Sequence, residues 1–493
     1  MTTRPPGKIN SRNVEDILPL TPMQENMLFQ YLKNPGSRLY MEQTCYRLTG
    51  DIPMDGEKVK RAWNFVASAN EMLRTLFRWQ GLKKPLQVIL KYHPVPLKEI
   101  DLSGLTLERK EEQLSQVKEN DRQNPIDLSC RPFRVILCRL TENRYEMIVS
   151  NHHIISDGWS NVVILKELAE AYNCIYLGKK WIKPVKNRYK EYIKMQRQQD
   201  KSYQTLYWRT FLKGFTSRTS IAAYYSSHQN PPLPEGEEKR YEYPLPEDLQ
   251  KKIYEFSRRE GVTLASLFYV AWAILIHKYN QVEDIIFGIT VSGRDSRVKG
   301  IQDMVGLFIN TLPLRLHISP ADEIKDFLKG VRKVLLEMEP FETTPLTEIV
   351  KCSEIGPKQA LFDSVLVIQN YPLDEAWFKE ESQLRIGLTT RFYMTKINLA
   401  LGVRAFRSII LDFSYNVNVF NERQIKKLSQ HLVTVLKTIV TDTGTRGINS
   451  LRTLKIKEIE IIEPREKEKI AFDIQENRKK LKAIEEVDFD EIF

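Results

Sequence analysis

The feature that most constrains the fold of this chain is a series of alternating strand-like and helix-like segments that occurs twice. The first series includes helical patterns at 22–31 and 56–70 and a strand-like stretch at 144–150. Thr21 and Gln24 predict a capping box at the start of the first helix. The second begins with the apolar segment "LASLFYVAWAILIHKY" and continues through strands such as "DIIFGITVS" and "SIILDFSYN". Residues 179–237 between them are charged and contain prolines. Two α/β lobes of unequal length, joined by a bridge, are the simplest architecture.

The predicted first lobe spans residues 14–178, the bridge and second lobe span 179–450, and residues 451–493 form a charged tail. The longest apolar run is roughly half as long as a membrane span requires. The opening residues "MTTRPPGKINSR" lack the apolar segment of a secretory signal. The five cysteines are scattered without a CxxC, so we expect reduced thiols and no disulfides or zinc site. These features predict a cytoplasmic protein with no membrane contact.

The net charge of +11 raises the question of an acidic partner. A nucleic-acid binder is one explanation, but the lysines and arginines are spread along the chain and no known nucleic-acid module is present. A basic solvated surface is another explanation. Attraction to acidic proteins or to phosphate-bearing groups is the third. We expect no nucleic-acid partner.

The stretch "SNHHIISDGWS", residues 150–160, is hard to explain by packing alone. It places His152 and His153 side by side, followed by Asp157 and Gly158. A strand-like segment precedes it, and Ser160 is a suitable N-cap for the helix that follows. The motif therefore falls on a loop between a strand and a helix, where a rigid scaffold often holds catalytic groups.

Histidine titrates near neutral pH and can accept or relay a proton. The sequence has no GxSxG elbow that would supply a protein nucleophile, and no second cluster supplies the carboxylates of a metal site. This combination suits direct acyl transfer, in which the attacking amine or hydroxyl belongs to a substrate. We expect Asp157 to lock the loop by pairing with a cation.

The motif HHIISDG resembles the active-site motif of condensation domains of nonribosomal peptide synthetases, members of the HHxxxDG acyltransferase superfamily. Other core motifs of that family are matched in order over residues 14–445: "LTPMQENMLFQ", "NEMLRTLF", "YWRTFLKG", "EDIIFGITVSGRDSRVKGIQDMVGLFINTLPLR" and "LFDSVLVIQNYP". The resemblance implies two lobes like chloramphenicol acetyltransferase, set in a V with a tunnel between them.

The resemblance also implies a function and partners for a free-standing domain of this kind. Such domains join a donor acyl or peptidyl thioester to the amine of an acceptor aminoacyl thioester. Both substrates hang from carrier proteins on phosphopantetheine arms, so no cofactor is expected to be bound by this chain itself. Because carriers of the family are usually acidic and each arm carries a phosphate, the basic surface fits such partners.

Site roles follow from the same resemblance. His153 matches the catalytic histidine that orients or deprotonates the amine, and His152 matches a mainly structural one. Asp157 matches the aspartate that forms a salt bridge with an arginine, here Arg294 in "SGR". The amide of Gly158 is placed to stabilise the oxyanion.

The chain departs from the family pattern at three places. Ala69-Asn70-Glu71 stands where Arg-His-Glu is usual, Asn26 replaces a glycine, and 397–399 lacks a late aromatic residue. Heterocyclization domains carry aspartates in place of both histidines, and plant-type acyltransferases carry DFGWG, so neither fits. An epimerization-type member shares HHxxxDG, although "MVGLFINTLPLR" resembles peptide-bond formers that use an L-configured donor. A non-catalytic module that recruits carriers or tailoring enzymes also stays open.

The charged tail has two interpretations. Residues 465–486 have the apolar stripe of an amphipathic helix, and "VDFDEIF" ends the sequence. The tail is either a linker remnant or a docking segment for another synthetase subunit that becomes ordered on binding.

Overall fold

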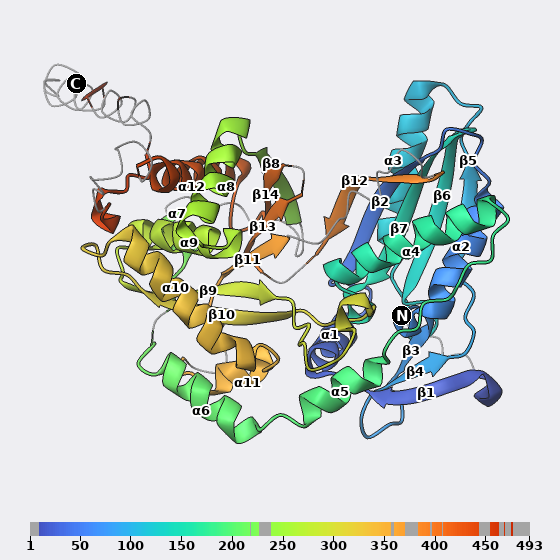
Figure 1. Cartoon of the computed structure of the whole chain (residues 1–493), viewed down its shortest axis with the longest axis horizontal. Helices are drawn as coiled ribbons and strands as arrows, with labels where there is room; N and C mark the ends of the chain where they lie inside the picture. The colour runs from blue at the N-terminus through green and yellow to red at the C-terminus, as the bar shows by residue number, and fades with distance from the viewer. Residues whose placement is uncertain are drawn as a thin grey trace, which may run out of the picture.

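The structure is a computed structural model, and two α/β lobes lie side by side in it as the arms of a V (Figure 1). It describes residues 9–216, 218–225, 238–355, 359–369, 383–394, 397–406, 408–442 and 454–462, together with 468, 475 and 476. The helices α5 and α6 run along one side and connect the lobes (Figure 1).

The first lobe contains a five-stranded sheet in the order β12-β2-β7-β6-β5 and a small three-stranded sheet in the order β1-β4-β3. Helices α2 and α4 pack against each other on one face of the larger sheet, and α3 covers the other (Figure 1). The elements from the first half of the chain are β1 (Val14–Pro19), α1 (Pro22–Lys33), β2 (Met41–Thr49), α2 (Gly56–Ala69), β3 (Thr75–Arg78), β4 (Leu86–Leu90), β5 (Leu97–Asp101), α3 (Leu107–Gln123), β6 (Phe133–Thr141), β7 (Arg144–His152) and α4 (Gly158–Tyr176).

The second lobe is built on a six-stranded sheet in the order β10-β9-β11-β13-β14-β8. The predicted apolar helix, α9, is buried in its core. The bridge and this lobe comprise α5 (Tyr189–Arg197), α6 (Lys201–Leu212), α7 (Ile221–Tyr225), β8 (Glu238–Pro244), α8 (Glu247–Glu260), α9 (Leu264–Asn280), β9 (Asp284–Val291), β10 (Asn310–His317), α10 (Ile324–Met338), α11 (Leu346–Lys351), β11 (Ser364–Gln369), β13 (Leu399–Ala405), β14 (Ile409–Asn416) and α12 (Glu422–Asp442).

One strand of the second series joins the sheet of the first lobe. This strand, β12 (Arg385–Tyr393), pairs antiparallel with β2 along its whole length, so that Tyr393 lies opposite Glu42. The strand was not predicted from the sequence, and a boundary at residue 178 therefore does not separate the two sheets. The crossing brings side chains of the second half of the chain to the edge of the first sheet.

Three local expectations can be compared with the structure. Thr21 and Gln24 form the predicted capping box at the start of α1. The cap of α4 was assigned wrongly: Asp157 is its N-cap and accepts the backbone N–H of Ser160 at 2.8 Å. Residues 454–459, assigned to the tail, instead pack against the second lobe, where the N–H of Ile324 donates to the carbonyl of Leu454. Most of the predicted tail helix, 465–486, lies outside the described residues.

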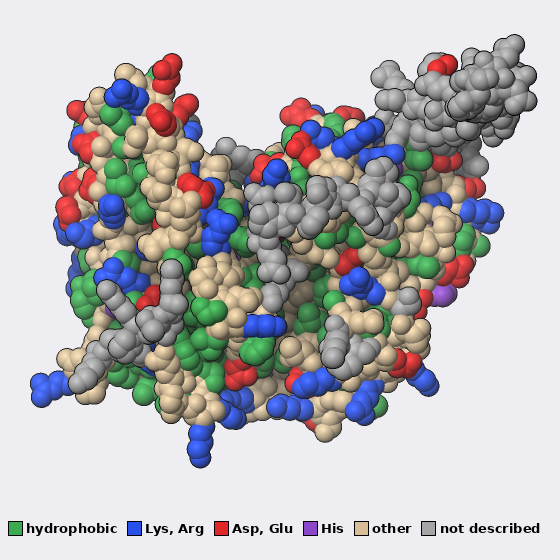
Figure 2. All heavy atoms as spheres, turned by 180° about the vertical axis from the view of Figure 1, so that it is seen from behind, with side chains coloured by type: hydrophobic (Ala, Val, Ile, Leu, Met, Phe, Trp, Pro, Cys, Tyr) green, Lys and Arg blue, Asp and Glu red, His purple; other side chains and the backbone are tan. Residues whose placement is uncertain are grey.

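Within the described residues, no single helix is long and apolar enough to cross a bilayer, and only α8 and α9 together, bent by 107°, reach that length. The described part of the chain also holds no group of three or more His, Cys, Asp or Glu side chains placed to bind a metal ion. On the face shown in Figure 2, lysines and arginines are interspersed with acidic side chains, and the surface is hollowed between the two lobes.

Candidate active site

The two histidines occupy the end of β7 and the 3₁₀ turn that follows it, His153–Ile155. The ring of His152 is buried between the edges of Tyr31 and Tyr40. Its Nδ1 accepts the backbone N–H of Ile154 at 3.1 Å, which fixes the ring. Burial, together with the neighbouring His153, lowers the pKa of His152 to about 3. His152 is therefore a neutral, packed side chain, as a structural role requires.

The ring of His153 is oriented differently and remains partly exposed, with 18% of its side-chain surface accessible. Its Nδ1 lies 3.2 Å from the carbonyl oxygen of Ser156. A carbonyl oxygen can only accept, so Nδ1 carries the proton and the lone pair of a neutral ring is on Nε2. This nitrogen lies 3.8 Å from Oε2 of Glu42, which is too long for a hydrogen bond. The lone pair is thus free to accept a proton from a substrate.

The predicted ion pair between Asp157 and Arg294 is present and almost fully buried. Arg294 Nη2 lies 3.1 Å from Asp157 Oδ1, and their side chains are 1% and 0% exposed. Asp157 also accepts the backbone N–H of Phe308 at 3.1 Å. Arg294 donates in addition to Ser160 Oγ and to the carbonyl of Met304. The loop that carries His153 is thereby fixed to the second-lobe segment that runs from β9 to β10.

Gly158 is the first residue of α4. The backbone N–H groups of a helix's first turn have no intrahelical acceptor and carry a partial positive charge. The predicted oxyanion role of the Gly158 amide is compatible with this position and stays a prediction, as does the tunnel.

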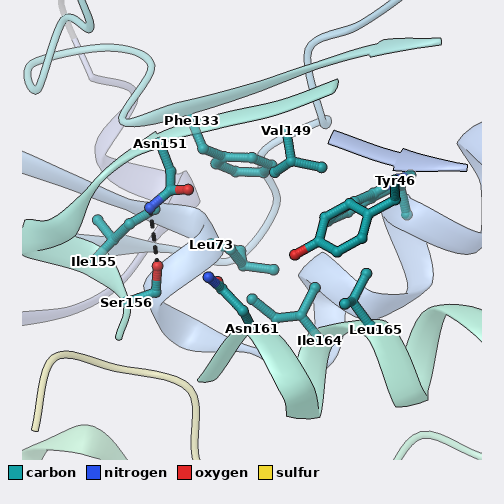
Figure 3. Close-up of a pocket in the computed structure, with 11 residues that line it drawn as sticks. Tyr46, Leu73, Phe133, Val149, Asn151, Ile155, Ser156, Asn161, Ile164 and Leu165 are labelled. Carbon is teal, nitrogen blue, oxygen red and sulfur yellow. Dashed lines mark hydrogen bonds between the residues drawn. The ribbon is translucent and has the colours of Figure 1, made fainter. Parts of the chain in front are cut away.

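A small pocket lies behind this loop, between the large sheet and α4 (Figure 3). Its walls are mostly apolar, and its polar groups are Tyr46, Asn151, Ser156 and Asn161. Asn151 Nδ2 donates to Ser156 Oγ at 3.2 Å (Figure 3). Because the Ser156 carbonyl holds His153, the pocket adjoins the residues that support the imidazole.

The departure at Ala69-Asn70-Glu71 is located in a contact between the first lobe and the bridge. Asn70 donates to Glu167 and accepts from Lys186, both at 2.7 Å, and Lys186 also pairs with Glu167. Glu71 accepts the side chain of Arg188 at 2.7 Å. The replacement thus supports an interface instead of adding a group beside His153. The other departure in the first lobe, Asn26, lines a second pocket near α1 and α5.

Sequence reasoning missed three polar residues near His153: Glu42 on β2, Asn161 on α4 and Arg391 on β12. Arg391 Nε donates to Glu42 Oε1 at 2.7 Å, and Asn161 Nδ2 donates to Glu42 Oε2 at 3.3 Å. Burial would raise the pKa of Glu42, but Arg391 and His153, with hydrogen bonds from Asn161 and Thr44, lower it to about 2. Glu42 is therefore a buried carboxylate that is ionised at neutral pH.

A comparison with protein families supplies the deciding observation: the family model "Condensation domain" matches residues 14–470. The chain belongs to the condensation domain family. Amide-bond formation between carrier-bound substrates is the known role of this family. The match extends over both lobes, and therefore over both members of the Asp157–Arg294 pair.

Curated relatives of the chain are synthases that are much longer than it is. The chain is 32% identical over 438 residues to surfactin synthase subunit 3 of Bacillus subtilis (strain 168), covering 88% of this chain and 34% of that protein. It is 32% identical over 448 residues to tyrocidine synthase 2 of Brevibacillus parabrevis, covering 88% and 12%. The condensation domain described here thus spans about a third or less of these relatives.

Solved structures share the fold. The first condensation domain of the calcium-dependent antibiotic synthetase, in complex with a substrate analogue, gives a TM-score of 0.73 at 18% identity, covering 92% of this chain and 100% of that one. The X-domain from teicoplanin biosynthesis gives 0.72 at 21% identity, covering 94% and 99%. These likenesses confirm the predicted α/β class of two chloramphenicol-acetyltransferase-like lobes.

Proposed function

We propose that this condensation domain forms an amide bond between a donor acyl or peptidyl thioester and the amine of an acceptor aminoacyl thioester. The single observation that carries the proposal is the state of His153. Its Nδ1 is held by the Ser156 carbonyl, its Nε2 is free to accept a proton, and the loop that bears it is fixed by a buried ion pair. A fixed base at a partly exposed position suits proton transfer from a substrate amine.

The proposed reaction needs no reagent beyond the two substrates. The amine nitrogen attacks the thioester carbonyl carbon while His153 Nε2 takes the proton that this nitrogen loses. The carbonyl oxygen becomes an oxyanion, for which the Gly158 amide is the proposed donor. The C–S bond then breaks, and the imidazolium returns the proton to the departing sulfur. The products are the amide and a free thiol.

The proposed partners are two carrier proteins, whose phosphopantetheine arms supply the thioesters. The net charge of +11 favours acidic carriers and their arm phosphates. The relatives named above are synthases much longer than this chain, which supports partners that lie on neighbouring domains or subunits. A role of the tail in recruiting such subunits belongs to the same proposal.

Intact-mass analysis of both carriers tests the proposal against its alternatives. The loaded donor and acceptor carriers are incubated with the domain in D₂O and in H₂O. Condensation transfers the donor mass to the acceptor carrier. An epimerization-type member would instead add one deuterium to the donor without transfer, and a recruiting module would bind carriers and change neither mass. Either of the last two results overturns the proposal.

A further inference from the structure

The carboxylate of Glu42 is the charged group that faces His153 most closely among the described residues. Its Oε2 lies 3.8 Å from His153 Nε2, and the residue is 1% exposed. An ionised carboxylate has no proton to donate, so Glu42 does not occupy the Nε2 lone pair that a substrate amine needs. It still exerts an electrostatic effect on the ring, because opposite charges within about 4–6 Å favour each other's ionised forms.

Three contacts aim the carboxylate at the ring. Arg391 and Thr44 donate to Oε1 at 2.7 and 3.2 Å, and Asn161 donates to Oε2 at 3.3 Å. The backbone adds to this, since Glu42 lies opposite Asn151 of β7 and opposite Tyr393 of β12. The carboxylate therefore has little freedom to turn away from His153.

The partner Arg391 comes from the crossing strand and connects Glu42 to the second lobe. Its backbone carbonyl accepts Nη1 of Arg240 at 2.6 Å, and Arg240 forms an ion pair with Asp412. A buried carboxylate without a cation tends to take up a proton. By supplying that cation, β12 keeps Glu42 ionised beside His153.

Two other titratable groups near Glu42 and His153 are neutral at pH 7. Burial raises the pKa of Tyr46 far above neutral pH, and it lowers the pKa of His152 to about 3. Among the described residues, Glu42 is thus the carboxylate that lies within 4 Å of a ring nitrogen of His153.

We propose that Glu42 is a positioning residue for the reaction, which acts through His153: its carboxylate, aimed by Arg391, stabilises the imidazolium that forms when His153 takes the proton of the attacking amine. This inference rests on the proposed function for its role in the reaction. The effect of the Glu42 charge on the protonation of His153 can be measured without any substrate.

The test is an NMR titration of His153 in the full chain labelled with ¹³C at histidine, with its signal assigned from its loss in His153→Gln. In Glu42→Gln, which keeps the shape of the side chain but removes its negative charge, the titration midpoint should move to lower pH. The acid limb of the pH profile of kcat/KM should move by the same amount. The matched control is Glu146→Gln, which removes another buried carboxylate of the same sheet, paired with Lys118 at 2.9 Å; it should leave the midpoint unchanged.

If Glu42→Gln does not fold, the double variant Glu42→Gln/Arg391→Gln should still show a downward shift, but a smaller one, because it also removes the positive charge that disfavours the protonated ring. An unchanged midpoint in the folded variant, with a wild-type chain that forms amide, overturns this inference alone. A wild-type chain that forms no amide overturns the proposed function and the reaction role of Glu42 with it.

Discussion

Replacing Asp157 by alanine should destabilise the first lobe far more than the loss of an ordinary helix cap. In the folded chain Asp157 accepts from Arg294 at 3.1 Å, from Phe308 N–H at 3.1 Å, and from the N–H and Oγ of Ser160 at 2.8 and 2.7 Å. The substitution leaves the guanidinium of Arg294 1% exposed and without its carboxylate.

The magnitude follows from that burial. Removing one partner of a buried ion pair costs about 3–5 kcal/mol, since the remaining charge stays in a medium that solvates it poorly. Removing the carboxylate cap of a helix costs about 1 kcal/mol by itself. We therefore expect Asp157→Ala to lower the free energy of unfolding by about 3–5 kcal/mol.

Equilibrium urea unfolding followed by tryptophan fluorescence measures this, with Trp159 beside Arg294 as a local reporter. The matched control is Asp55→Ala, because Asp55 also caps a helix, α2, but is largely exposed and only weakly paired. Removing both charges, in Asp157→Ala/Arg294→Met, should cost clearly less than the sum of the two single substitutions. If Asp157→Ala lowers the free energy of unfolding no more than Asp55→Ala does, the buried ion pair does not join the two lobes in the way proposed.

Three further predictions concern other parts of the molecule. Because burial lowers the pKa of His152 from 6.5 to about 3, the unfolded chain binds a proton between these pH values that the folded chain does not. The free energy of unfolding should then fall by roughly 1.4 kcal/mol per pH unit as the pH drops through this window. In urea titrations of a folded His152→Gln variant, the free energy of unfolding should depend less steeply on pH. An equally steep dependence would contradict the assignment of His152 as a buried neutral histidine. Asn70→Ala removes hydrogen bonds from Lys186 and Glu167 and should lower the free energy of unfolding by about 1–3 kcal/mol. Turnover per folded molecule should stay unchanged. A loss of turnover without a loss of stability would show instead that Asn70 takes part in the reaction. Deleting 464–493 should preserve the fold and maximal turnover but raise the partner concentration needed for half-maximal turnover, and equal activity at low concentration would make the tail a linker.

Local signals in the sequence predicted much of the fold. The capping box of Thr21 and Gln24 and the apolar helix α9 depend on neighbouring residues, and both are found. The cap of α4 was misassigned because Asp157 and Ser160 are both good capping residues and lie close together in the sequence; in the structure Arg294 donates to the side chains of both. The crossing strand β12 was not predicted at all, and its pairing with β2 joins residues from opposite halves of the chain, which no local pattern indicates.

The residues of the candidate site also fall into two groups, those that local motifs predict and those that they do not. His153, Asp157 and Arg294 lie in compact motifs whose spacing is informative. Glu42 and Arg391 are single charged residues on strands, in a chain where charged residues make up 28% of the sequence. Glu42 comes beside His153 when β2 pairs with β7, and Arg391 reaches Glu42 when β12 pairs with β2, so no local pattern could have revealed either residue.

The central claim is that His153 transfers the proton during amide formation, and single-turnover kinetics with His153→Ala test it most directly. Loaded donor and acceptor carriers are mixed with an excess of wild-type or variant chain, quenched over time, and read by intact mass. Loss of a general base lowers rates by about 10²–10⁴-fold, so the variant should form amide at least about 10²-fold more slowly. Its thermal unfolding and carrier affinity should stay close to wild type, because the side chain is partly exposed and is not part of the buried Asp157–Arg294 pair. A folded variant that forms amide at nearly the wild-type rate would contradict the assignment of His153 as the catalytic base.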